Sequence, residues 1–560
     1  MEILQKRQRD KRMPFSLKME GCYMRKRRQV WLMLLVSVLL IMPYQTVGAT
    51  GKIPDPQPMG QVSFDGAQME ALPAPGNSTT PGTWFIGATP ANADLSKPPI
   101  VFVQGLHSRA QSWWEETNYH GVNDMYETAY NKGYRTAFVQ LYDAPGGDAA
   151  TPMDNGRLLA GMLEKIYNHF GQKVNIVAHS KGGPDSQAAL IHYGAYRYVN
   201  KVVTLGSPHE GSHLADLAYS SWAGWLAALL GKQDPGTYSL QVGEMAKYRA
   251  QTDNHANARL NKYYTAAGTS WGPTFSALAL GGAYLSQYGE NDGLVNVWST
   301  DLPYGTHLFT ASDLDHDEIR IGRAVFSKIE SVLRTATATS ATEPKASQPS
   351  AAVNSADKQE TFVRGGALPI SKQLVQQVPV EPGVKEAIFT VRTKAADTQV
   401  TLVSPSGKVL KPVLKSKDQA FFRGATVQVI RVAKPEVGNW QVKLLSKQKD
   451  AYLLTTHFMG KTTVELDLPA LNKQSSAELK LKGLESVDLA SLTGKIKVVD
   501  PQGQVKEMAL NKTKKADATL TGAVSGSQAG VYNITVELSG KTKDGQPYAR
   551  TLVKSVYIGK

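Results

Sequence analysis

An apolar run that ends in a serine between small residues constrains the fold of this chain more than any other feature. The segment reads Val174-Asn175-Ile176-Val177-Ala178-His179-Ser180-Lys181-Gly182-Gly183, and a helical pattern follows over 185–193. A strand that turns directly into a helix brings the two backbones close together, so the residues two before and two after the turn must be small. Ala178 and Gly182 meet that condition. The segment therefore predicts a tight strand-to-helix turn with Ser180 at its apex.

The region around this turn alternates between strand and helix patterns. Apolar runs predict strands over 99–103, 134–141, 174–178, 201–205, 263–267 and 307–310, and helical spacing appears over 157–170 and 318–333. Strands separated by helices form a parallel sheet that is covered on both faces. We therefore predict an α/β fold with a doubly wound, mainly parallel sheet for residues 58–334.

Two later residues are placed to activate Ser180. A nucleophilic serine on such a turn needs a histidine base and an acid that orients it, in the chain order Ser, acid, His. Asp292 lies in a predicted turn, and His316 lies in a loop just before the last helix. Asp315 is too close in sequence to His316 to orient it easily, and His209 ends another predicted strand. We predict Ser180, Asp292 and His316 as a catalytic triad.

Two backbone N–H groups are predicted to face the charge that develops on a reacting carbonyl oxygen. The N–H of Lys181 lies at the start of the helix behind Ser180, where helix N–H groups are free. The second donor should come from the turn after the strand 99–103, which reads Gln104-Gly105-Leu106-His107-Ser108. Gly105 allows a close backbone approach, so the Leu106 N–H is the expected second donor of an oxyanion hole.

The first 49 residues have the layout of a secretory signal peptide. Four basic residues within 25–28 precede the 13-residue apolar run 30–42, and Val47-Gly48-Ala49 gives a small-x-small cleavage pattern. The alternative is a membrane anchor, but a spanning helix needs about 20 apolar residues. We expect cleavage after Ala49, with Met24 as an alternative start of translation. Cleavage would remove Cys22, the one cysteine. We expect a secreted, extracellular protein, with association with the cell wall as one alternative.

The C-terminal part differs from the middle of the chain in charge and texture. Residues 335–560 hold 32 basic and 19 acidic residues, whereas residues 50–334 are net acidic. Residues 335–357, rich in Ala, Thr, Ser and Pro, are expected to be a linker. Two similar turns 96 residues apart, at 404–408 and 500–504, indicate two β-sandwich domains, over 358–460 and 461–560. The basic charge favours binding to an anionic cell-wall polymer, and no nucleic-acid reader motif is present.

A run of apolar side chains over 214–230 is a candidate lid. Among its members are Trp222, Trp225, Leu226 and Leu229, which recur near helical spacing. The run follows the predicted strand 201–205, and tryptophan is favoured at a lipid–water boundary. A buried core helix explains the same pattern, and the two alternatives remain open.

At these motifs the chain resembles the bacterial secreted lipases and esterases of the α/β-hydrolase superfamily, in the subgroup with an Ala-His-Ser-x-Gly elbow. The resemblance covers roughly residues 80–334 and also rests on the runs 206–212, 291–295 and 315–318. It implies carboxylic ester hydrolysis by the Ser180, Asp292 and His316 triad. A triacylglycerol lipase is expected first, acting on a lipid or ester substrate at an interface.

The resemblance leaves several alternatives. A short-chain esterase and an extracellular polyester (polyhydroxyalkanoate) depolymerase share this scaffold, and a cell-surface binding protein with an inactive hydrolase domain is a function of another class. No cofactor is expected. Some relatives hold calcium near the catalytic histidine, where Glu318 has a suitable offset, but Arg323 stands where another ligand is expected. We therefore predict no metal ligand. No segment of the mature chain is apolar enough to span a membrane.

Overall fold

The computed structural model describes residues 52–62, 68–69, 79–230, 234–335, 357–460, 464–467, 477–512, 520–524 and 528–559. The predicted signal peptide and almost all of the predicted linker lie outside these residues. Within the described residues, no helix is both long and apolar enough to cross a membrane.

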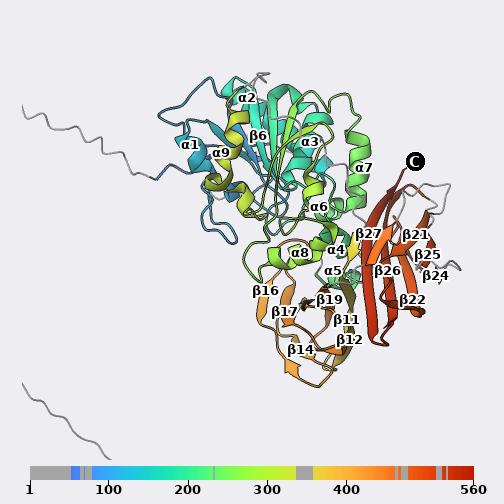
Figure 1. Cartoon of the computed structure of the whole chain (residues 1–560). Helices are drawn as coiled ribbons and strands as arrows, with labels where there is room; N and C mark the ends of the chain where they lie inside the picture. The colour runs from blue at the N-terminus through green and yellow to red at the C-terminus, as the bar shows by residue number, and fades with distance from the viewer. Residues whose placement is uncertain are drawn as a thin grey trace, which may run out of the picture. The chain divides into compact units, whose positions relative to one another are not determined.

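A nine-stranded sheet forms the centre of the N-terminal half (Figure 1). Its strands lie in the order β2-β1-β3-β5-β4-β6-β7-β8-β9. The neighbouring strands from β5 through β9 pair in parallel, and β1 to β3 are antiparallel. The strand bounds are β1 (Gln57–Val62), β2 (Gln68–Met69), β3 (Thr83–Ile86), β4 (Ile100–Val103), β5 (Thr136–Val139), β6 (Val174–His179), β7 (Val199–Leu205), β8 (Lys262–Gly268) and β9 (Gly305–Ala311).

Helices cover both faces of this sheet and separate two apolar cores. The core on one face contains side chains of α2 (Pro152–Phe170) and α3 (Gly182–Ile191). The core on the other face contains side chains of α1 (Met125–Asn131) and α9 (Gly322–Leu333). The predicted α/β class and doubly wound, mainly parallel sheet are therefore confirmed. The antiparallel strands β1 to β3 escaped the sequence analysis.

The connections at the carboxyl ends of the later strands carry the remaining helices. Between β7 and β8 lie α4 (His213–Ala218), α5 (Gly224–Leu230), α6 (Pro235–Ser239) and α7 (Val242–Thr252), and between β8 and β9 lies α8 (Ala277–Leu285). Short 3-10 helices complete the set: η1 (Ala110–Trp113), η2 (Ala195–Tyr198), η3 (Ser286–Tyr288), η4 (Val297–Thr300) and η5 (Glu318–Arg320). The candidate lid 214–230 is thus two short helices joined by a turn.

The C-terminal half consists of four antiparallel sheets around two apolar cores, which confirms the predicted all-β class. One core lies between the sheets β11-β19-β13-β17-β16 and β12-β18-β14-β15. These strands are β11 (Thr361–Leu368), β12 (Leu374–Val380), β13 (Glu386–Thr393), β14 (Gln399–Val403), β15 (Val409–Leu410), β16 (Leu414–Lys417), β17 (Thr426–Ala433), β18 (Gly438–Leu445) and β19 (Asp450–Met459). We call this part the first sandwich.

The second core belongs to the sheets β10-β20-β21-β25-β24 and β23-β22-β26-β27. The strands are β10 (Asp357–Gln359), β20 (Val464–Asp467), β21 (Ala477–Lys482), β22 (Val487–Val499), β23 (Val505–Ala509), β24 (Asn511–Lys512), β25 (Leu520–Val524), β26 (Gly530–Thr542) and β27 (Pro547–Ile558). We call it the second sandwich. Its strand β10 precedes the first sandwich in the chain, so the two sandwiches are interleaved rather than strictly consecutive.

The two similar turns noticed in the sequence have the same structure. Gly407 donates its N–H to the Ser404 carbonyl and Gly503 donates to the Asp500 carbonyl, each at 2.9 Å. Both glycines have positive φ, 90° and 78°, which a turn of this kind requires. The repeat of turn chemistry in the sequence therefore reflects a repeated structural unit.

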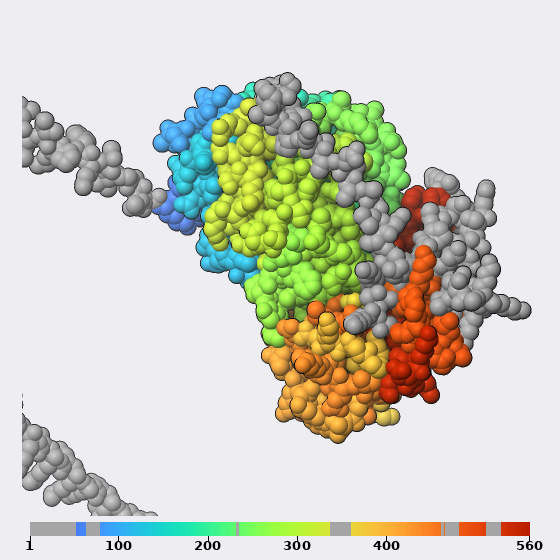
Figure 2. Space-filling model, in the orientation of Figure 1, coloured from blue at the N-terminus to red at the C-terminus, as the bar shows by residue number. Residues whose placement is uncertain are grey.

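The helices α4 and α5 pack against strands of the sandwiches, and Figure 2 shows the N-terminal half, in blue to green, in direct contact with the first sandwich, in orange. Leu214, Leu217 and Leu226 share one apolar cluster with side chains from β11, β19 and β27. At its edge the Asp216 carboxylate, fully buried, accepts hydrogen bonds from the N–H of Ser555 in β27 and from its hydroxyl. The same carboxylate also accepts the Val242 N–H and bonds the His213 ring. The α/β part of the chain, residues 58–334, is called the catalytic half from here on. It shares a continuous apolar core with the sandwiches, and Asp216 is a buried polar anchor between them.

This anchor yields a stability prediction. Asp216→Ala should lower the free energy of unfolding by about 3 kcal/mol or more, because several buried donors lose their acceptor and each costs roughly 1–3 kcal/mol. Chemical denaturation followed by tryptophan fluorescence measures the change. Asp313→Ala, at an exposed carboxylate, is the control and should change stability by less than about 0.5 kcal/mol. Equal effects of the two substitutions would contradict the anchoring role.

Candidate active site

Ser180 lies at a sharp turn between β6 and α3, in the left-handed region of backbone space. Its φ is +54°, which is strained for a residue with a side chain. The crowding around it explains two glycines. A Cβ on Gly105 would lie 2.7 Å from Ser180 Cβ, and a Cβ on Gly182 would lie 2.5 Å from the Gln104 carbonyl oxygen. Only glycine at these two positions lets the loop after β4 approach the turn at Ser180.

The structure brings the three predicted catalytic side chains together. His316 Nε2 lies 3.0 Å from Ser180 Oγ, and His316 Nδ1 lies 2.8 Å from Asp292 Oδ2. The other oxygen of Asp292 accepts the N–H groups of Leu294 and Val295 at 3.0 and 2.8 Å. All three side chains are at least nine-tenths buried. The carboxylate is therefore fixed by backbone donors and fixes the imidazole in turn, which leaves Nε2 facing the serine.

His179, the residue before the nucleophile, holds the loop that carries His316. His179 donates from Nε2 to the His316 carbonyl at 2.8 Å, and the two rings lie 4.8 Å apart. Burial lowers the pKa of His179 well below its ordinary value, and the neighbouring His316 lowers it further. His179 is thus a neutral donor. Asp315 does not contact the His316 ring and instead bonds His120 Nε2 at 2.7 Å. His209 is fully buried against Gln187 and does not line the pocket.

The turn that carries Leu106 is braced by side chains on both sides. Gln104 Nε2 donates to the Ser108 carbonyl at 3.1 Å and so closes the turn. His107 has a positive φ of 51° and pairs through Nε2 with Asp234 Oδ2 at 3.0 Å. Burial raises the pKa of Asp234, but the hydrogen bond and charge of His107, together with hydrogen bonds from the Thr237 N–H and hydroxyl, lower it by more. Leu106 lines the same pocket as Ser180, where its N–H was expected.

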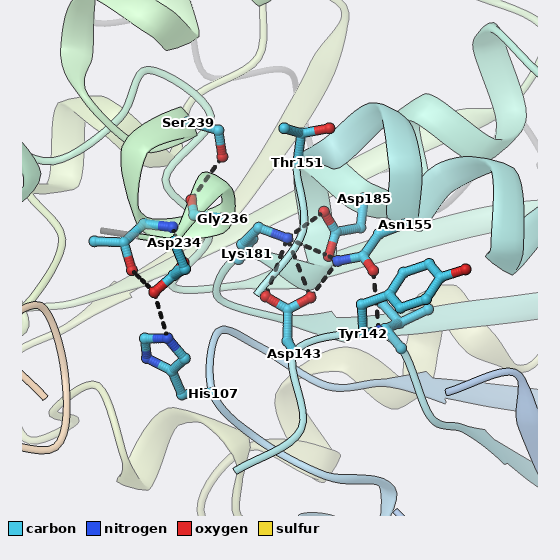
Figure 3. A network of polar contacts seen from close by, with 12 residues as sticks. His107, Tyr142, Asp143, Thr151, Asn155, Lys181, Asp185, Asp234, Gly236 and Ser239 are labelled. Carbon is cyan, nitrogen blue, oxygen red and sulfur yellow. Dashed lines mark hydrogen bonds and ion pairs between the residues drawn. The ribbon is translucent and has the colours of Figure 1, made fainter. Parts of the chain in front are cut away.

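The side chain of Lys181 has a role that the sequence analysis did not assign. Although the residue follows Ser180, its ammonium turns into the protein and lies between two carboxylates (Figure 3). Nζ is 2.9 Å from Asp185 Oδ1 and 3.2 Å from Asp143 Oδ1. Asn155 donates to both carboxylates. The pattern offered one signal that could have found this cluster, because Lys181 and Asp185 are four residues apart at the start of a helix.

The pocket at Ser180 has a volume of about 660 Å³, and its lining comes from both halves of the chain. The catalytic half contributes Leu106, His107, Ser180 and His316 among others, and the first sandwich contributes the loop Lys417–Gly424. The described pocket lining does not include the candidate lid residues Trp222, Trp225, Leu226 and Leu229. Sequence reasoning missed the loop because it lies 237 to 244 residues after Ser180, and so large a separation leaves no local pattern.

The candidate lid instead meets the sandwiches. The Trp222 ring lies between two cations, with the Arg364 guanidinium 5.0 Å and the Lys497 ammonium 4.0 Å from its centre. Leu226 is fully buried and Leu229 is half-buried in the shared cluster, whereas Trp225 is 61% exposed. Part of the basic charge of the C-terminal half is therefore used within the chain, and the segment is partly core in this arrangement.

His120, Asp315 and Glu318 form a group whose ligand atoms all lie within 4.8 Å of one another. The surroundings do not favour calcium. Asp315 Oδ1 accepts two backbone N–H groups and Oδ2 bonds the imidazole directly. The Arg323 guanidinium donates to the carbonyls of His120 and Val122, so a cation already occupies the acceptors beside the group. The resemblance alone therefore suggests calcium here, and the contacts of these residues do not fit it.

Comparison with known proteins extends the resemblance. No family model matches the chain. Two curated triacylglycerol lipases, from Pseudarthrobacter phenanthrenivorans and Burkholderia plantarii, are each 25% identical to it over 217 residues, which is 36% of this chain. The chain spans 63% and 56% of the length of these two lipases, respectively.

A solved structure matches nearly the whole chain. The Bacillus licheniformis lipase BlEst2, crystallised in propeptide form, is 35% identical. The match covers 86% of this chain and 98% of that one, with a TM-score of 0.71. This likeness extends well beyond the catalytic half, because 86% of the chain cannot be covered without the sandwiches. The chain therefore belongs to the lipase and esterase family of α/β-hydrolases, a family of carboxylic ester hydrolases.

Proposed function

We propose that this chain is a serine carboxylic ester hydrolase, and specifically a triacylglycerol lipase. The observation that carries the proposal is the single hydrogen-bonded line from Asp292 through the His316 ring to Ser180 Oγ. A serine held at a strained turn beside a pocket, with a base in reach and the base oriented by a buried carboxylate, is the arrangement that acyl transfer needs. The two curated triacylglycerol lipases support the choice of substrate.

The proposed reaction proceeds through an acyl-enzyme. His316 takes the Ser180 proton while the serine oxygen attacks the ester carbonyl, and Asp292 stabilises the imidazolium that forms. The N–H groups of Leu106 and Lys181 hold the tetrahedral oxyanion. The imidazolium then gives its proton to the leaving alcohol. A water molecule, deprotonated by His316, hydrolyses the acyl-enzyme and returns the serine to its resting state.

The triad gives the first functional prediction. Ser180→Ala, Asp292→Asn and His316→Ala should each lower ester turnover severely, by about 10⁴-fold or more for Ser180, because members of a triad act as a unit. Labelling by a fluorophosphonate should be lost with Ser180→Ala. Asp315→Asn is the matched control, since Asp315 precedes His316 but bonds His120. A larger loss with Asp315→Asn than with Asp292→Asn would show that the orienting acid was wrongly chosen.

The substrate panel separates the alternatives. Hydrolysis of emulsified triolein is expected of a triacylglycerol lipase, whereas activity confined to tributyrin identifies a short-chain esterase. Clearing of a polyhydroxyalkanoate film identifies a polyester depolymerase. Wild-type protein that binds surfaces but neither turns over any ester nor reacts with a fluorophosphonate would be a binding protein with an inactive hydrolase domain.

We also propose that the first sandwich restricts access to Ser180 in this chain. The loop Lys417–Gly424 forms one wall of the pocket, and its Phe421 joins an apolar cluster that contains Leu106. The loop is stiff because the Asp418 carboxylate accepts two of its N–H groups and pairs with Arg392. The relative BlEst2 was solved in propeptide form, and a propeptide role for the sandwiches fits this wall.

This restriction predicts a size-dependent gain. Phe421→Ala should raise kcat/KM for tributyrin about tenfold while changing hydrolysis of the small p-nitrophenyl acetate less than about twofold, because only a bulky substrate has to displace the ring. A tenfold gain corresponds to about 1.4 kcal/mol. Val413→Ala, at an exposed valine of the same sandwich, is the control. An unchanged tributyrin rate, or an equal gain for both esters, would exclude the wall as a barrier.

Export and cell-wall association belong to the same proposal. They rest on the basic and apolar pattern of residues 1–49 and on the excess of basic residues in 335–560. Binding of the full chain to purified cell walls should fall steeply between low and physiological salt, because the attraction would be electrostatic. Salt-independent binding, or none, would remove the cell-wall partner.

A further inference from the structure

The cluster around the Lys181 ammonium is more deeply buried than its charge would favour. The exposed fractions are 0% for Lys181, 1% for Asp143, 1% for Asp185 and 0% for Asn155. Nζ lies 2.9 and 3.1 Å from the two oxygens of Asp185 and 3.2 and 3.3 Å from those of Asp143. Such a network is costly to bury unless its members satisfy one another. Its position directly behind Ser180 therefore calls for an explanation.

The charges of the cluster do not balance when every group is ionised. One ammonium faces two carboxylates, and Asn155 adds no charge. Burial raises the pKa of Asp185 to about 8, against the lowering effect of Lys181, and the charge of Asp143 raises it as well. Burial lowers the pKa of Lys181, but the two carboxylates raise it by more, so the ammonium keeps its proton. The raised pKa of Asp185 favours its protonated form, which would bring the net charge of the cluster to zero.

The cluster links the turn that carries Lys181 to three other segments: the loop after β5, the start of α2 and the start of α3. Asp143 belongs to the loop after β5, whose Pro145 lines the pocket. Asn155 is in the first turn of α2, and its side-chain Oδ1 accepts the Tyr142 N–H. Asp185 lies in the first turn of α3. Figure 3 shows the ammonium between the two carboxylates, with the separate His107–Asp234 pair to one side.

Lys181 has two roles on one residue. Its backbone N–H is the donor assigned to the oxyanion hole. Its ammonium lies within 3.3 Å of all four carboxylate oxygens of the buried Asp143 and Asp185. A peptide unit whose side chain is anchored in this way cannot rotate without stretching an ion pair. Oxyanion donors act in the transition state only if they are already in place, so small displacements are costly.

We propose that Lys181, Asp143 and Asp185 form a buried clamp that positions the Lys181 N–H in the oxyanion hole. The clamp acts through the backbone and its members are positioning residues. The proposal rests on the proposed serine hydrolysis. A further titratable group next to Asp185 is Tyr248 of α7, which donates its hydroxyl to the Pro184 carbonyl, and burial keeps its pKa well above the ordinary value.

Lys181→Met tests the clamp by removing the ammonium while keeping the length of the side chain. The expected result is a 10- to 100-fold fall in kcat with KM changed less than about twofold, because the donor is engaged only in the transition state. Lys173→Met, at an exposed lysine one residue before β6, is the control and should retain wild-type kinetics. Wild-type kcat in folded Lys181→Met would overturn the proposal.

A triple variant separates positioning from stability. Lys181→Met combined with Asp143→Asn and Asp185→Asn leaves no buried charge unpaired, and neutral replacement of a buried ion network is often tolerated. The clamp predicts that kcat stays low in the triple variant even where its unfolding midpoint returns toward the wild-type value. Recovery of kcat together with stability would show that the cluster is merely structural, and would overturn the proposal.

Protonation of Asp185 predicts a pH dependence. The pKa of Asp185 is raised in the folded chain, so its stabilising contribution is complete below about pH 4 and is lost as pH rises toward 8. Above pH 8 the cluster gains a negative charge beside the oxyanion hole, and kcat should fall. Asp185→Asn should remove both pH dependences. If kcat of Asp185→Asn falls above pH 8 as it does in wild type, the role of the proton is overturned.

Failure of this proposal is distinguishable from failure of the proposed function. Reaction of wild-type chain with a fluorophosphonate at Ser180, measured by intact mass, establishes the nucleophile without reference to Lys181. If wild type is labelled and Lys181→Met matches it in kcat and in its pH profile, the clamp is excluded and the serine hydrolase remains. If wild type is neither labelled nor active, the proposed function is excluded and the clamp with it.

Discussion

The strained turn at Ser180 is the constraint on which the active site depends. A side chain at a φ of +54° persists only where surrounding contacts determine it, and here parallel strands on both sides of β6 provide them. The Ser180 N–H bonds the Leu205 carbonyl of β7, and Gly105 comes within contact of the serine from the β4 side. Because the Leu106 turn, the nucleophile and the His316 loop follow β4, β6 and β9 of one sheet, and Asp292 lies in the connection between β8 and β9, the geometry of the sheet sets the geometry of the site.

A second constraint is the apolar face of α4 and α5. In a chain without the sandwiches this face would meet water, whereas here β11, β19 and β27 cover it and Asp216 anchors the contact. The same packing places the first sandwich so that Lys417–Gly424 reaches the pocket. The stability of the shared core and the accessibility of Ser180 are therefore linked by one interface, and a change that loosens the anchor is expected to affect both.

Local patterns predicted what local physics governs. Strands β4 to β8 appear as apolar runs because their residues are almost all buried, and the serine turn appears because its neighbours must be small. The antiparallel strands β1 and β3 were missed, since short segments at a sheet edge carry little periodicity. The helical spacing over 214–230 predicts one amphipathic helix, but a second helix begins at Gly224. The apolar side chains of both helices pack against the sandwiches.

The sequence by itself determined the class of the fold, the three residues proposed as the triad and the two backbone donors, because each follows from chain order and from the steric needs of one turn. Only the tertiary structure decided what surrounds them. The Lys181 ammonium meets Asp143 across 38 residues, and the pocket wall comes from residues more than 200 positions away. Such contacts arise from how the sheet and the sandwiches pack, and packing between distant segments leaves no periodic trace in the sequence.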